Sequence, residues 1–156
     1  MKEKTDYIIF NKPVGCTVSE AQELLKENRT THTHPIGDLD ENSEGLLVFT
    51  TNEHAKESET NENEYEITID RYLSKAAEHI LAKGMTIEGE YFNGITLIEE
   101  KHKGKRSVVR LKSSKTKDTD IRKMFEAIQY HVVGIRRVGI REFKLGVLSI
   151  GRWKFV

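Results

Sequence analysis

Residues 64–70 alternate polar and apolar side chains with a period of two, and this pattern constrains the fold more than any other in the chain. Such alternation is typical of a half-buried strand, here with Tyr65, Ile67 and Ile69 on one face. The other apolar runs, residues 7–10 and 46–49, are also of strand length and far too short to span a membrane. The core is therefore expected to consist largely of short strands.

Three segments carry helical signals: residues 19–28, 74–83 and 118–130. Ser19 and Gln22 have the spacing of a capping box, Ser74 can cap the second helix, and Asp118 or Thr119 the third. Further strands are predicted near residues 85–88, 95–99, 107–111, 132–138 and 142–145. Residues 29–42 are interpreted as a polar loop, and residues 52–63 as a polar surface excursion. We therefore predict a single α+β domain over residues 1–156, dominated by sheet.

The charges are unevenly distributed, although the formal net charge is zero. Residues 1–100 hold 9 Lys and Arg against 21 Asp and Glu, whereas residues 101–156 hold 16 against 4. A basic C-terminal part is typical of proteins that bind a polyanion, and equally of a dipolar solvated surface. Charge alone leaves both interpretations open.

Cysteine, histidine and acidic residues give little sign of a disulfide or a metal. Cys16 is the one cysteine, so no internal disulfide can form, which favours a reducing, cytoplasmic setting. The Asp38, Asp40 and Asn42 spacing invites a calcium-loop interpretation, but the sixth and twelfth loop positions are a serine and a phenylalanine. We expect no metal, no organic cofactor, no membrane segment and a monomeric protein.

Four segments, taken in order, resemble the pseudouridine synthases that modify single uridines in ribosomal RNA. They are residues 11–15 (NKPVG), 37–50 (GDLDENSEGLLVFT), 64–67 (EYEI) and 121–128 (IRKMFEAI), the last continuing through Arg136 and Arg137 to Trp153. The second resembles the family's Gly-Arg-Leu-Asp signature followed by Gly-Leu-Leu. The resemblance is to the family's short form, so we expect a protein of the short large-subunit branch, without the N-terminal S4-type RNA-binding module.

The resemblance implies a mixed, mostly antiparallel sheet flanked by helices, and isomerisation of a specific uridine to pseudouridine. That reaction breaks the N-glycosidic bond and rejoins the base through C5, which needs a carboxylate beside a flipped-out uridine. By position Asp40 is the nucleophile, Tyr65 lies against the uracil, and Arg122 pairs with Asp40 in a desolvated pocket.

An RNA partner, expected to be ribosomal, implies cations that contact phosphates. The candidates are Lys12, the basic turn formed by Lys101, Lys103, Lys105 and Arg106, and the pair Arg136 and Arg137. The basic turn fits a solvated surface equally well. Residues 136 and 137 are neighbours on a predicted strand, so at most one of them can face a cleft.

Asp38 departs from the family pattern, which has arginine two residues before the catalytic aspartate. A carboxylate there repels phosphate, and Asn63, where the family usually has lysine, removes another positive charge. Losing one preorganised cation costs on the order of a hundred- to a thousand-fold in rate. Two alternatives therefore stand beside the enzyme: a catalytically impaired RNA-binding or ribosome-assembly protein, and a protein-interaction domain.

Overall fold

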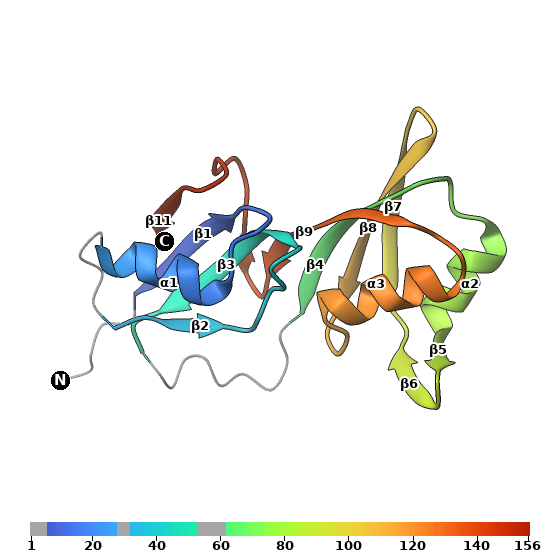
Figure 1. Cartoon of the computed structure of the whole chain (residues 1–156), viewed down its shortest axis with the longest axis horizontal. Helices are drawn as coiled ribbons and strands as arrows, with labels where there is room; N and C mark the ends of the chain where they lie inside the picture. Colours follow the sequence, from blue (N-terminus) through green and yellow to red (C-terminus); the bar gives the residue numbers. More distant parts are fainter. Residues whose placement is uncertain (1–5, 28–31, 53–61) are drawn as a thin grey trace.

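The structure is a computed structural model that describes residues 6–27, 32–52 and 62–156, and its centre is one long β-sheet (Figure 1). The strands of this sheet are β1 (Tyr7–Lys12), β2 (His34–Ile36), β3 (Glu44–Thr50), β4 (Asn63–Ile69), β7 (Thr96–Lys103), β8 (Arg106–Ser113), β9 (Val132–Ile140), β10 (Phe143–Lys144) and β11 (Trp153–Phe155). Within the described residues the order is β11-β1-β3-β9-β4-β8-β7, with β2 paired to β3 and β10 to β9. β3 and β9 run parallel, and the other pairs are antiparallel. The predicted α+β class with a mixed, mostly antiparallel sheet is confirmed.

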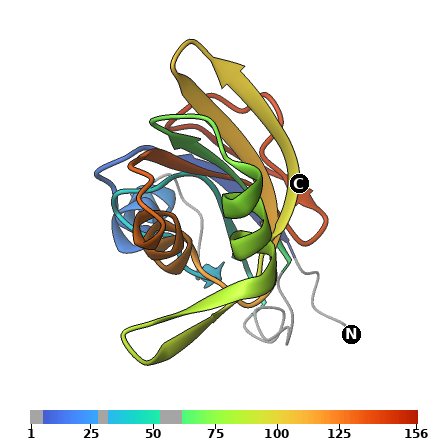
Figure 2. The same ribbon diagram turned by 90° about the vertical axis from the view of Figure 1, so that its right-hand side faces the viewer.

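Three helices in the described part of the chain cover one face of this sheet: α1 (Val18–Glu27), α2 (Lys75–Lys83) and α3 (Asp118–Ala127). In Figure 2, α1 and α3 lie on the same side of the strands. Tyr65, Ile67 and Ile69 are buried under this layer together with Phe125 of α3, which confirms the predicted alternation. A small separate hairpin consists of β5 (Gly84–Ile87) and β6 (Glu90–Asn93).

The helix boundaries confirm one predicted cap and correct two others. α1 begins at Val18, and the Thr17 hydroxyl accepts a hydrogen bond from the Glu20 amide at 3.1 Å, so Ser19 lies inside the helix and does not form the predicted capping box. Ser74 accepts a hydrogen bond from the Ala77 amide, as expected for the start of α2. The N-cap of α3 is Lys117, without a side-chain cap bond, so neither Asp118 nor Thr119 caps that helix as predicted. The carboxylate of Asp118 is bonded to a different segment of the chain, described below.

Three short strands were not predicted from the sequence: β2, β6 and β11. β2 and β11 lie against β3 and β1, and β6 pairs with β5. Runs of three or four residues are too short to show a period, so partner strands decide their conformation. The predicted surface excursion at residues 52–63 falls largely outside the described residues.

Candidate active site

The segment between β2 and β3 carries Asp38 and Asp40, and it lies where the two parts of the sheet meet. β3 touches β9 there through Glu44 and Gly45, which pair with Arg136 and Arg137. Gly45 has φ +109°, and a Cβ on it would come within 2.3 Å of the Arg137 carbonyl oxygen. Glycine is therefore required at this position. The loop at residues 37–43 is thus fixed beside the crossing of β3 and β9.

Lys12 is completely buried, and its side chain binds backbone carbonyl groups instead of facing solvent. Its ammonium donates to the carbonyl oxygens of Cys16 at 2.6 Å and Pro13 at 3.0 Å, and to that of Glu41 at 3.3 Å. Burial lowers the pKa of Lys12, while the negative charges of groups such as Asp40 oppose part of that shift. The prediction that Lys12 contacts RNA is wrong, because its ammonium is enclosed by the chain.

Asp118, the first residue of α3, holds the same loop from the other side. Its Oδ2 accepts hydrogen bonds from the Asp40 amide at 2.9 Å and from the Ser43 hydroxyl at 2.7 Å. The side chain is 3% exposed. Sequence reasoning missed this residue, because an aspartate at a helix start is also the common sign of a cap.

Arg137 is a third buried charge that contacts the loop. Its Nη1 donates to the Asp38 carbonyl oxygen at 3.0 Å, and its Nε donates to the Leu46 carbonyl oxygen at 2.9 Å. Arg136, the next residue on β9, lies on the opposite face and pairs with Glu66 at 3.0 Å. The prediction that at most one of the two arginines faces a cleft is confirmed.

A pocket of about 220 Å³ lies beside the loop, walled by Asp38, Tyr65 and Arg137. Tyr65 is the register partner of Arg137 on the neighbouring strand. Burial raises the pKa of Tyr65, while the nearby charge of Arg137 opposes this rise and that of Asp118 adds to it. The pocket therefore brings a buried aromatic ring next to a buried guanidinium, on the same side of the sheet as the helices.

Two lysines that sequence reasoning missed also line this pocket: Lys115 and Lys117, in the turn between β8 and α3. Both side chains are exposed, and neither forms an ion pair with another described residue. Asp38 is exposed as well, and its Oδ1 accepts a hydrogen bond from the Leu39 amide at 2.9 Å. The exposed positive charge at the pocket rim is thus supplied by the turn before α3, in addition to the buried Arg137, and not by position 38.

Arg122 does not pair with Asp40 in the structure, which contradicts the predicted ion pair. Its Nη1 donates to the Val132 carbonyl oxygen at 3.3 Å, at the start of β9. The Asp40 Oδ2 accepts instead from the Asn42 amide at 3.0 Å, within the loop. Because Ile121 and Phe125 pack into the core, they set the rotation of α3 about its own axis. In this rotation the Arg122 side chain reaches the start of β9.

The basic turn is the tip of the hairpin formed by β7 and β8, and it lies away from the pocket. Lys103 pairs in register with Arg106, and Lys101 with Val108, so Lys101, Lys103 and Arg106 share the face that carries Arg110 and Arg136. This face is opposite to that of Tyr65. Lys105 is exposed at the very tip. These cations therefore do not line the pocket.

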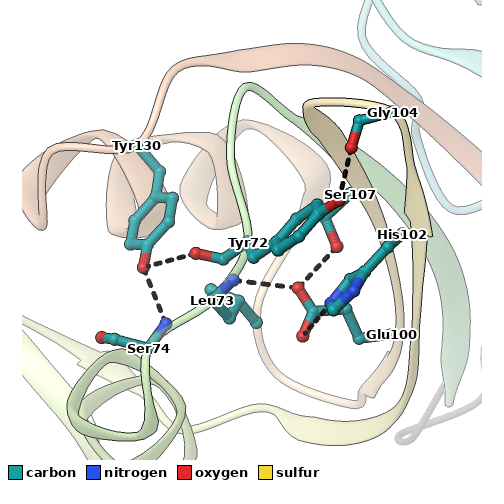
Figure 3. A network of polar contacts seen from close by, with 8 residues as sticks. All are labelled: Tyr72, Leu73, Ser74, Glu100, His102, Gly104, Ser107 and Tyr130. Atoms are coloured by element: carbon teal, nitrogen blue, oxygen red, sulfur yellow. Dashed lines mark hydrogen bonds and ion pairs between the residues drawn. The ribbon is translucent and has the colours of Figure 1, made fainter.

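A polar network braces the hairpin against the segment before α2 (Figure 3). The ring of His102 stacks on Tyr72, with centroids 3.6 Å apart, and the Tyr72 hydroxyl donates to the Gly104 carbonyl oxygen at the tip. The Glu100 Oε2 accepts from the Leu73 amide at 2.9 Å and from the Ser107 hydroxyl at 2.5 Å. The hairpin is thus held in a defined orientation at its tip and at the strand residues next to the tip.

Across residues 6–27, 32–52 and 62–156, no three His, Cys, Asp or Glu side chains are grouped so as to hold a metal ion. In the same part of the chain no helix has the length and apolar character needed to cross a membrane.

The sequence pattern of the family described as "RNA pseudouridylate synthase" matches residues 6–127. An uncharacterized RNA pseudouridine synthase of Helicobacter pylori is 25% identical over 180 aligned positions, covering 99% of this chain and 68% of that protein. The ribosomal large subunit pseudouridine synthase B of Buchnera aphidicola is 32% identical, covering 84% of this chain and 57% of that protein. The chain thus spans about two thirds or less of these relatives.

The fold is also similar to that of a solved structure. A crystal structure of a pseudouridylate synthase superposes with a TM-score of 0.84, covering 99% of this chain and 71% of that one, at 22% identity. At this identity the likeness concerns the fold.

Proposed function

The chain belongs to the RNA pseudouridylate synthase family, and on that premise we propose that it converts one uridine of ribosomal RNA, in the large subunit, to pseudouridine. The observation that carries the proposal is the loop at residues 37–43. It matches the family's signature region, and it is held on three buried charged side chains beside a pocket that contains Tyr65. The choice of ribosomal RNA rests on the large-subunit enzyme among the relatives.

In this proposal Asp40 is the nucleophile. The reaction breaks the bond between N1 and C1′ and forms one between C5 and C1′, while the C5 proton is lost and N1 gains a proton. Product and substrate are isomers, so no co-reactant is consumed. Asp40 is partly exposed, as a carboxylate that must reach the sugar or base of a flipped-out nucleotide has to be.

The pocket residues then take complementary parts. The ring of Tyr65 forms an apolar wall for the uracil, and Arg137 supplies positive charge next to it. Lys115 and Lys117 at the pocket rim attract the phosphates on either side of the flipped nucleotide. The hairpin cations Lys101, Lys103, Lys105 and Arg106, with Arg136, contact a more distant stretch of the RNA, since they lie on the other face. The protein is proposed to act as a monomer in the cytoplasm.

Asp38 supports a second candidate function, that of a catalytically impaired RNA-binding or ribosome-assembly protein. Its exposed carboxylate lies at the pocket, where it repels phosphate and offsets one of the two lysines. The two candidates differ in what Asp40 does, because only the enzyme needs its carboxylate for chemistry.

The deciding experiment compares pseudouridines in ribosomal RNA from source cells carrying the wild-type gene, a deletion, or Asp40→Asn. The enzyme predicts one site that is lost both on deletion and in the Asp40→Asn strain. A deletion that removes no pseudouridine, with RNA still bound by the purified protein, would support the impaired homologue. Bound RNA would be recovered by crosslinking from the same cells.

A further inference from the structure

The Asp118 carboxylate accepts two hydrogen bonds from a segment that is far from it in sequence. Oδ2 accepts from the amide of Asp40, 78 residues away, and from the hydroxyl of Ser43, 75 residues away. Its own helix begins without its help, because Lys117 is the N-cap. The carboxylate therefore serves the loop and not the helix.

We propose that Asp118 is a positioning residue, which fixes the backbone of the Asp40 loop and through it the direction of the Asp40 carboxylate. The effect of Asp118 on catalysis rests on the function proposed above. The effect of Asp118 on the position of the loop does not depend on that function. Inside the loop the Ser43 amide donates to the Asp40 carbonyl oxygen, and the Asn42 amide to Asp40 Oδ2. These bonds give the loop its shape. The hydrogen bonds to Asp118 fix the position of the loop relative to α3.

A second anchor acts from the opposite side, which makes the position of Asp40 well defined. The Glu41 carbonyl oxygen accepts from the Gly15 amide at 2.8 Å and from the Lys12 ammonium at 3.3 Å. The loop is thus held from α3 at residues 40 and 43, and from β1 and the turn after it at residue 41. The positive charge of Lys12 also acts on both Asp40 and Asp118, so it offsets the repulsion between the two carboxylates.

Deleting the carboxylate removes one anchor and leaves those at Glu41 and at the Asp38 carbonyl oxygen. In Asp118→Ala the Asp40 amide and the nearly buried Ser43 hydroxyl lose their acceptor, and the loop can shift while Glu41 stays attached. In Asp118→Asn the amide oxygen can accept the same two bonds. Asp120 is the other acidic residue in the first turn of α3, so Asp120→Ala is the matched control for removing a negative charge there.

The first test is hydrogen exchange of the Asp40 amide, measured by NMR on the full chain. Exchange should be at least about tenfold faster in Asp118→Ala than in the wild type, and close to wild type in Asp118→Asn and Asp120→Ala. Should Asp118→Ala not fold, Asp118→Ser removes the long acceptor but keeps a polar group at the helix start. An Asp40 amide that exchanges equally in the wild type and the deletion variant overturns the proposal.

The second test is steady-state pseudouridine formation on the ribosomal RNA fragment that contains the site lost in the deletion strain. A displaced nucleophile should lower kcat by about ten- to a hundredfold and leave KM within threefold, because RNA contacts are untouched. Asp118→Asn should recover most of the rate. A loss confined to KM, or a kcat that does not change, contradicts the inference. A wild type that forms no pseudouridine would refute the proposed function, and the exchange result would then decide the positioning role alone.

Discussion

Tyr65 on β4 and Arg137 on β9 are register partners, and so are Glu66 and Arg136, their neighbours on the same two strands. Side chains alternate along a strand, so the first pair faces the pocket and the second faces the opposite side of the sheet. On that opposite side Glu66 pairs with Arg136 at 3.0 Å, and Glu64 with Arg110 at 2.6 Å. The cations that the sequence suggested as RNA contacts therefore belong to two faces with different environments.

Lys12→Met should destabilise the protein without weakening RNA binding. The change leaves three backbone carbonyl oxygens without their ammonium donor, a loss of about 1–3 kcal/mol in the free energy of unfolding. Urea unfolding measures the loss, and Lys105→Met at the exposed hairpin tip is the control. A clear loss of RNA affinity in a fully folded Lys12→Met protein would restore the surface role that the structure denies to this lysine.

Replacing Lys115 and Lys117 together by alanine should weaken RNA binding and reduce its salt dependence. Each phosphate contact to a single strand contributes about 0.7 to the slope of log affinity against log salt concentration, so the slope should fall by about 1.4. Stability should stay within about 0.5 kcal/mol, because both side chains are exposed. Binding is measured by fluorescence anisotropy at several salt concentrations. The same titration on the triple variant Lys103→Ala, Lys105→Ala, Arg106→Ala shows whether the hairpin face contributes separately to RNA binding. An unchanged slope in the Lys115 and Lys117 double variant would exclude the pocket rim as a phosphate site.

Asp38→Arg should raise the rate of pseudouridine formation by tenfold or more. A cation at this exposed position next to the pocket attracts the RNA backbone, where the carboxylate repels it. The fold should tolerate the change, since the Asp38 side chain makes one bond, to the adjacent Leu39 amide. Asp38→Asn separates the removal of repulsion from the added attraction and should lie between the two. Equal rates in all three folded proteins would mean that Lys115 and Lys117 already supply the charge.

Glu100→Gln should make the stability of the protein less dependent on acidic pH. Burial by itself raises the pKa of Glu100, but the hydrogen bonds from Ser107 and the Leu73 amide outweigh it and hold the pKa below its ordinary value. A carboxyl whose pKa is lower in the folded than in the unfolded state stabilises the fold at pH values above the ordinary glutamate pKa of about 4.3. This stabilisation is lost as the pH falls through the folded-state pKa. The advantage of the wild type over Glu100→Gln should therefore be full at pH 7 and shrink towards pH 3.

Urea midpoints of both proteins across this range measure the effect. Glu99→Gln, on the same strand but half exposed and 3.9 Å from Lys101, controls for the loss of one surface carboxylate. A wild-type advantage that grows as the pH falls would contradict the assignment.

The sequence by itself determined those features that depend on local periodicity and local chemistry. The alternation at Tyr65, Ile67 and Ile69 fixed a buried strand face, since side chains two residues apart must share a side. Ser74 and Gly84 marked the two ends of α2 because capping uses the nearest backbone groups. The order of the family segments indicated where Asp40 and Tyr65 belong.

Tertiary structure decided the partners of the charged residues, because those partners lie far away along the chain. Lys12 and Asp118 are separated by more than a hundred residues, yet both hold the Asp40 loop, and no local pattern distinguishes them from an RNA-binding lysine and a capping aspartate. Arg122 was assigned to Asp40 by its place in the motif, but the rotation of α3 directs its guanidinium to Val132. A buried charge must find an opposite charge or a hydrogen-bonding group, and which group is within reach depends on how strands and helices pack.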